Sequence, residues 1–206
     1  MTKQKRYTCF LKVTDYQKKY LETRYGSPVC FPSCSMIQLM LRRYLVRNAS
    51  MKRITDFSFS SSAFSYEPSG TMFLSEYQSL TDEEKKSFIE MELPEEVLYG
   101  NKAVRVDQFF QLSASGARRI RNEIKNEFWL AFSSFRDDCL FRAARIGETL
   151  TTEDIMSDFM NVYDIDMKSY DSLMRNWWRV KPKIKDRIEG KRDELEEKSG
   201  NVFIYT

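Results

Sequence analysis

The fold class is decided by residues 113–147, which read SASGARRIRNEIKNEFWLAFSSFRDDCLFRAARIG. Apolar side chains recur in this stretch at intervals of three and four residues: Ile120, Ile124, Phe128, Phe132 and Phe135. That period places them on one face of an α-helix. Gly147 supplies the stop signal at the end of the stretch. We therefore expect one long amphipathic helix in the second half of the chain.

The first 53 residues predict a basic module made of short strands and helices. Residues 6–13 have the pattern of a strand, and Thr14 or Asp15 can cap a helix that ends before Gly26. A second helix is expected to begin at Ser33, with an apolar stripe along one side. The other side of that helix is rich in arginine: Arg42, Arg43 and Arg47.

Residues 54–112 predict a small amount of sheet and one more helix. Aromatic and serine residues alternate over 54–66, which is typical of a strand with one buried face, and residues 71–80 are expected to pair with it. Thr81 and Glu84 have the spacing of a capping box, which predicts a helix from there to about Met91. Residues 97–112 are expected to be extended or irregular.

These segments together predict an α+β protein that is predominantly helical, with a small N-terminal sheet. We divide the chain into a basic N-terminal α+β part (1–112), a helical part (113–192) and an acidic C-terminal tail (193–206). The sequence shows neither an apolar run long enough for a membrane span nor the apolar core of a signal peptide. A cytoplasmic protein without a membrane partner is therefore expected.

The chain contains no histidine, and this absence removes several classes of enzyme site. Ser-His-Asp triads, Cys-His dyads and zinc sites that use histidine are all excluded. The four cysteines are spaced irregularly, so we expect free thiols at core positions instead of disulfides or zinc ligands: Cys9, Cys30, Cys34 and Cys139. The sequence thus predicts no bound metal and no cofactor, and it favours a protein without catalytic activity.

Positive charge is segregated along the chain, although the net charge is only +3. Residues 1–53 hold twelve Lys and Arg against two acidic residues, and residues 168–192 hold nine against three. The compensating acidic residues lie mainly in 82–96 and 193–197. Segregated positive charge is typical of a protein that binds a polyanion. The alternative is that basic and acidic segments pair with each other across the folded surface. Under the first interpretation, the two basic segments are expected on a common side of the molecule.

Residues 152–180 resemble a helix-turn-helix unit. Thr151 or Thr152 can cap a first helix, and a turn at 164–166 leads into a second helix. The resemblance implies that the second helix lies in the major groove of DNA. The segment departs from the usual pattern at two positions, since Asp164 stands where the turn commonly has Gly, and Met160 where a small residue is usual. Asp can adopt the left-handed backbone conformation that such a turn requires.

A basic and aromatic run follows at 175–192, with the sequence RNWWRVKPKIKDRIEGKR. Neighbouring residues point in different directions on a helix, so Trp177 and Trp178 are not expected to be equally buried. Trp178 follows Met174 at a spacing of four, which favours it as the core residue, although Trp177 continues the spacing from Leu173. Trp177 is then the candidate to stack on bases or sugars. The candidate nucleic-acid-binding residues are Arg175, Trp177, Arg179, Lys181, Lys183 and Lys185, together with Arg42, Arg43 and Arg47.

These patterns favour a nucleic-acid-binding protein, with DNA as the preferred ligand, that acts as a regulator or accessory factor. The first alternative is a protein–protein adaptor or structural component whose charged segments serve a protein partner or a second copy. The second alternative is a metal-dependent nuclease. Glu123-Ile124-Lys125 resembles the last element of some such enzymes, and the acidic segment 82–96 contains oxygen ligands suited to magnesium. A solvated helix start is the simpler explanation of that acidic segment.

Overall fold

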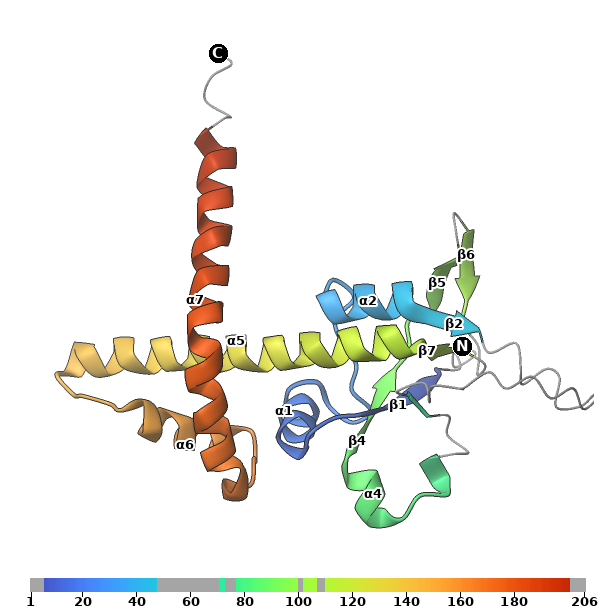
Figure 1. Ribbon diagram of the computed structural model, residues 1–206, viewed down its shortest axis with the longest axis horizontal. Helices are drawn as coiled ribbons and strands as arrows, with labels where there is room; N and C mark the ends of the chain where they lie inside the picture. Colours follow the sequence, from blue (N-terminus) through green and yellow to red (C-terminus); the bar gives the residue numbers. More distant parts are fainter. Residues whose placement is uncertain (1–5, 48–70, 73–76, 100–101, 107–109, 201–206) are drawn as a thin grey trace, which may run out of the picture. The chain divides into compact units, whose positions relative to one another are not determined.

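In the computed structural model, the described residues are 6–47, 71–72, 77–99, 102–106 and 110–200. The chain divides into two compact units, Met1–Asn126 and Glu127–Thr206. The first unit combines short antiparallel strands with helices, whereas the described part of the second is helical (Figure 1). The predicted α+β class, dominated by helices, is confirmed. None of the described helices is both long enough and apolar enough to cross a membrane.

A three-stranded antiparallel sheet organises the N-terminal unit. It has the order β3 (Thr71–Met72), β1 (Thr8–Lys12) and β4 (Phe88–Glu92). Thr8 pairs with Glu92 at one end of the β1–β4 ladder, and Lys12 pairs with Phe88 at the other. Leu11, Ile89 and Met91 are fully buried there. Two smaller antiparallel pairs join β2 (Leu45–Arg47) to β7 (Phe110–Leu112) and β5 (Glu96–Tyr99) to β6 (Lys102–Arg105).

Local capping signals place the helices α1 (Asp15–Tyr25) and α2 (Met36–Tyr44). At the start of α1, the Thr14 backbone N–H donates to Gln17 Oε1 over 3.1 Å, and the helix ends at Gly26 with φ +85°. Both boundaries were expected from the sequence. At the start of α2, Ser35 Oγ accepts a hydrogen bond from the Gln38 backbone N–H over 3.1 Å. This helix begins at Met36, three residues beyond the predicted start at Ser33.

Two helices are shorter than the sequence pattern indicates. The capping box at Thr81 is confirmed, since the Thr81 backbone N–H donates to Glu84 Oε2 over 2.9 Å, but α4 (Asp82–Lys86) ends well before Met91. The predicted continuation to Met91 is wrong because the next residues form β4 and bury Phe88 and Ile89 against the rest of the sheet. Pairing with a distant strand overrides the local helical tendency.

The arginine-rich helix also ends earlier than expected. α2 stops at Tyr44, and Leu45–Arg47 pair with β7, so Arg47 lies on a strand and not on the helix that carries Arg42 and Arg43. The predicted strand over 54–66 falls outside the described residues. Thr71–Met72, which were expected to pair with that strand, pair with β1.

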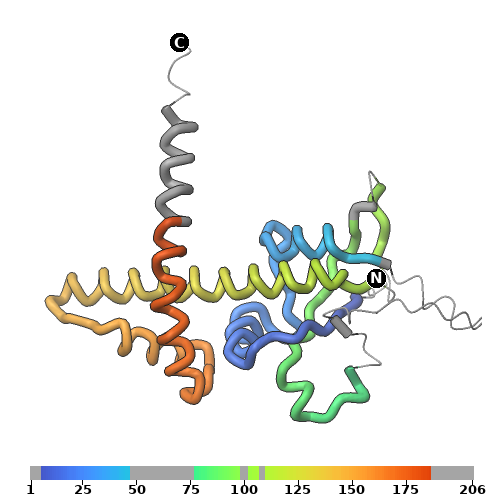
Figure 2. The backbone as a smooth tube through the Cα atoms, viewed as in Figure 1, coloured from blue at the N-terminus to red at the C-terminus, as the bar shows by residue number. Residues whose placement is uncertain are grey.

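The C-terminal unit is built around aromatic side chains from three helices. It contains the second part of α5 (Ala114–Ile146), α6 (Thr152–Val162), the short 3-10 helix η2 (Met167–Ser169) and α7 (Tyr170–Gly200). Figure 2 traces this path from yellow through orange to red. Phe132 of α5 lies 5.3 Å from Phe159 of α6 and 4.8 Å from Trp177 of α7, measured between ring centroids. The predicted apolar stripe of α5 supplies this core.

The connection from α6 to α7 follows the sequence pattern closely. The Thr151 hydroxyl accepts a hydrogen bond from the Asp154 backbone N–H over 3.1 Å, which starts α6. Asp164 adopts the left-handed conformation with φ 52°, and the next residue, Ile165, is buried. Leu173 is also buried. Two helices clasping a small core are therefore present, and the helix-turn-helix assignment itself stays a prediction.

Candidate nucleic-acid interface

The exposed side of α7 carries cations in two neighbouring lines. Arg175, Arg179 and Lys183 follow one another at intervals of four, so they form one line along the helix, and all three are exposed. Trp178, Lys181 and Lys185 follow at intervals of three and four and form the second line. We call this set of six side chains the α7 basic face. It unites five of the residues that the sequence singled out.

Trp178 is the aromatic member of this face, and Trp177 is not. Trp178 is 52% exposed, whereas Trp177 is 1% exposed and packs against the rings of Phe132 and Trp129, with centroid distances of 4.8 and 6.1 Å. The expectation that Trp178 belongs to the core is wrong. Trp177 is buried because it shares the inward side of α7 with Leu173 and Ile184. The spacing from Leu173 was the sequence signal for this assignment.

A groove of about 570 Å³ runs beside Trp178, between α5 and α7 of the C-terminal unit. Its apolar lining comes from Trp177, Trp178, Pro182 and Ile184, and its charged lining from Arg136, Asp137, Lys181 and Lys185. Three cations thus face one carboxylate. The residues of α5 in this lining were not recognised from the sequence, because nothing in their spacing ties them to α7.

Arg136 is held in place within this groove. Its Nη1 lies 3.0 Å from Asp137 Oδ1, and its Nε donates to Thr152 Oγ1 over 3.5 Å. On the α7 side, Lys181 Nζ lies 5.0 Å from the centroid of the Trp178 ring, a cation–π contact. The groove therefore combines an aromatic surface with positive charge at its edge.

A second hollow, of about 470 Å³, also borders Trp178 and has a different charge balance. Its other lining residues are Glu153, Tyr170, Asp171, Met174 and Arg175. Two carboxylates face one guanidinium in this hollow. The groove lined by Lys181, Lys185 and Arg136 therefore has the larger excess of positive charge.

The remaining candidates belong to the N-terminal unit. Arg42 and Arg43 are exposed at the end of α2, and the Arg43 guanidinium lies 5.9 Å from the centroid of the Tyr44 ring. The side chain of Arg47 lies outside the described part of the structure. Because these arginines and the α7 basic face lie in different units, a common side for the two basic segments stays a prediction.

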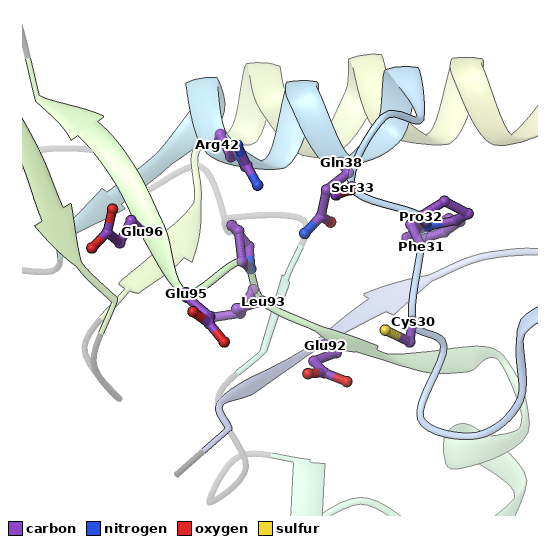
Figure 3. Close-up of a pocket in the computed structure, with 11 residues that line it drawn as sticks. Cys30, Phe31, Pro32, Ser33, Gln38, Arg42, Glu92, Leu93, Glu95 and Glu96 are labelled. Carbon is purple, nitrogen blue, oxygen red and sulfur yellow. The ribbon is translucent and has the colours of Figure 1, made fainter. Parts of the chain in front are cut away.

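One of these arginines lines a pocket together with acidic side chains. Figure 3 shows Arg42 and Gln38 of α2 beside a pocket of about 490 Å³ that Glu92, Glu95 and Glu96 also line. Glu92 also pairs with Arg6, whose Nη1 lies 3.2 Å from Glu92 Oε2. Three carboxylates around one guanidinium make this pocket a poor site for phosphate. Within this unit, the acidic segment 82–96 offsets part of the basic charge.

Two of the cysteines, Cys9 and Cys30, are poor nucleophiles. All four are free thiols, and Cys9 is buried as expected, whereas Cys30 and Cys34 are exposed, contrary to the expected core positions. Burial, followed by the negative charge of Glu90, raises the pKa of Cys9 to about 12. Partial burial and then Glu92 raise the pKa of the Cys30 thiol above its ordinary value. Neither thiol is activated as a thiolate.

No metal-binding arrangement is found where side chains are described. No group of three Cys, Asp or Glu residues converges there in a way that could hold a metal ion. Ile124, between Glu123 and Lys125, is buried in the apolar stripe of α5. The α7 basic face and its groove are therefore the strongest candidate site.

Comparison of the chain with protein-family models, with curated proteins and with solved structures finds no match. The function is consequently argued from the chemistry of this surface.

Proposed function

We propose that the protein binds nucleic acid, with DNA as the preferred ligand, through the α7 basic face. The observation that carries the proposal is the alignment of five Lys and Arg side chains with an exposed Trp178 on one helix. Cations at helical intervals can neutralise successive phosphates and release the counterions condensed on them. This release supplies a favourable free energy of binding that does not depend on base sequence.

The scaffold under this face supports the proposal. Leu173 and Trp177 are buried on the opposite side of α7, and Trp177 packs against Phe132 of α5. The helix backbone that carries the cations is therefore fixed to the core of the unit. Binding groups on an ordered helix reach their ligand more accurately than groups on a loop.

The resemblance to a helix-turn-helix unit gives a second, independent reason to expect DNA. Such a unit would place the first turns of α7 in the major groove. Asp171 is exposed in those turns, whereas the cations begin at Arg175. The middle of α7 could contact phosphates while its first turns lie in the major groove. These phosphate contacts could also form if the first turns did not enter the groove.

The test of the proposal is the salt dependence of binding. We expect the variant Arg175→Gln, Arg179→Gln, Lys183→Gln to bind random-sequence DNA more weakly and with a shallower dependence of affinity on salt. The slope of log affinity against log salt should fall by about 0.9 for each phosphate contact that is lost. Fluorescence anisotropy with labelled DNA at several salt concentrations measures both quantities.

The matched control removes the same charge elsewhere in the same unit. Arg142, Arg145 and Lys168 are exposed and lie outside the α7 basic face. The variant Arg142→Gln, Arg145→Gln, Lys168→Gln should keep the wild-type slope. Equal loss in both variants would show that only net charge matters, and absence of any binding at low salt would contradict the proposal.

A protein–protein adaptor remains the second candidate. Large apolar side chains of the C-terminal unit are exposed: Phe141, Ile146, Val162 and Met167. Exposed apolar side chains can mark a protein interface when they form a contiguous patch. This candidate takes precedence if the protein binds no nucleic acid.

A further inference from the structure

We propose that the groove beside Trp178 accepts an unpaired nucleobase, so that single-stranded nucleic acid is the preferred ligand class. The inference rests on the proposed function and adds that the bound nucleic acid is single-stranded. Base stacking on an exposed aromatic ring, combined with a positively charged edge, is the usual chemistry of single-strand binding.

The aromatic surface has the required position and exposure. Half of Trp178 is open to solvent, and it is the exposed one of the three tryptophans. Its ring forms one wall of a groove whose size falls within the range of small-ligand sites, roughly 300–1,000 Å³. Pro182 and Ile184 extend the apolar lining, so a flat ring placed against Trp178 would be shielded from water on several sides.

The charges around the groove suit the sugar–phosphate backbone of a bound base. Lys181 Nζ lies 5.0 Å from the Trp178 ring centroid, and Lys185 follows on the same line of α7. Arg136 faces them from α5 with its position set by Asp137 and Thr152. Cations therefore stand on both walls of the groove, within reach of phosphates that flank a stacked base.

An unpaired base differs from the bases of duplex DNA in the surface that it can offer to Trp178. In a duplex the faces of the bases are stacked on each other, and only their edges are open in the grooves. An unpaired base can turn its face to an aromatic side chain. The Trp178 groove therefore distinguishes the two forms, whereas the cations of α7 attract both.

The experiment compares the two forms of DNA on the full chain. An oligothymidylate of about 16 nucleotides and a random-sequence duplex of the same length, both labelled, are titrated with wild type and with Trp178→Ala. We expect wild type to bind the single strand more tightly. Trp178→Ala should lose about fivefold to 150-fold in single-strand affinity, the range for one stacked base, and little in duplex affinity.

Two controls keep the result specific. Trp178→Phe retains a ring and should recover most of the single-strand affinity. Phe141→Ala removes another exposed ring of this unit, one that also has a cation over it, since Arg145 lies 6.0 Å from its centroid. Phe141 lies outside the groove, so this variant should bind like wild type.

Each outcome decides between the two proposals. Selective loss of single-strand binding in Trp178→Ala supports the inference. Wild-type affinity of Trp178→Ala for both forms, with binding that still depends on the α7 cations, overturns the inference and leaves the proposed function intact. Failure of wild type to bind either form at low salt overturns both.

Discussion

Adjacent tryptophans on α7 have opposite environments, and this difference defines the candidate site. Trp177 contacts the rings of Trp129 and Phe132 in the core, whereas Trp178 contacts the Lys181 ammonium at the surface. Successive residues on a helix are separated by a large rotation about its axis, so one side chain points inward when the next points outward. The same two-residue sequence therefore places one ring in the core and the other at the surface, where we propose that it binds the ligand.

Because of this difference, we expect alanine substitution of Trp177 to destabilise the protein far more than alanine substitution of Trp178. Trp177→Ala should lower the free energy of unfolding by about 3–5 kcal/mol, because it removes a large buried ring and leaves a cavity. Trp178→Ala should change it by no more than about 0.5 kcal/mol, because the ring is exposed. Urea denaturation followed by circular dichroism measures both. Similar losses in the two variants would contradict the assigned burial.

Among the elements, α6 depends most clearly on a local signal at its start. Thr151 donates to Asp154 Oδ2 twice, from its hydroxyl over 2.6 Å and from its backbone N–H over 3.2 Å. In return, the Asp154 backbone N–H donates to the Thr151 hydroxyl over 3.1 Å. The pKa of Asp154 is held below its ordinary value, first by the hydrogen bond from the Thr151 side chain and second by the one from its backbone. The helix start is therefore sensitive to pH.

Removal of this cap should destabilise the protein in a pH-dependent way. Thr151→Ala is expected to cost about 1 kcal/mol at neutral pH. Because the folded state lowers the pKa of Asp154, the contribution of this carboxylate is present above its ordinary value of 3.8 and is lost as pH falls through the lower folded-state value. Wild type and variant should therefore differ less in acid, and the NMR titration of Asp154 should move toward its ordinary pKa in the variant.

A second substitution in the same helix serves as the control. Ser157→Ala also removes a hydroxyl, whose bond is made to the Glu153 carbonyl within the helix and not at its start. This variant should be close to wild type in stability at both pH values. Equal destabilisation by the two substitutions would show that the cap has no special role.

At the scale of the whole molecule, the basic candidates fall into different units with different surroundings. The groove beside the α7 basic face is lined by three cations and one carboxylate. Arg42, in the N-terminal unit, shares its pocket with Glu92, Glu95 and Glu96. Local charge balance, and not the number of basic residues in a segment, therefore decides which arginines can attract a polyanion.

The contribution of the N-terminal unit can be measured with the variant Arg42→Gln, Arg43→Gln. We expect the salt slope of DNA binding to fall by at most about one, since the carboxylates beside Arg42 leave only Arg43 to contact phosphate. Anisotropy titrations of this variant, of the Arg175→Gln, Arg179→Gln, Lys183→Gln variant and of wild type allow the three salt slopes to be compared. A fall of about two would mean that both arginines contact phosphate.

Local interactions explain what the sequence determined by itself. The starts of α1, α4 and α6, the end of α1 at Gly26 and the end of α5 before Gly147 all follow from groups a few residues apart. The left-handed turn at Asp164 and the apolar stripe of α5 belong to the same class. Capping and helical periodicity act within one or two turns, so they can be recognised without knowledge of the fold.

Contacts between distant segments decided the rest. Residues 88–92 form β4 because β1, far away in the sequence, pairs with them. Trp177 is buried because α5 and α7 pack together, and the same packing brings Arg136 opposite Lys181 and Lys185. Glu92, Glu95 and Glu96 line the same pocket as Arg42 only because of the fold of the N-terminal unit. The helical pattern of α7 identifies two tryptophans and several cations as candidates. Which of these side chains face a groove depends on how α5 packs against α7, and the local sequence of α7 does not encode that packing.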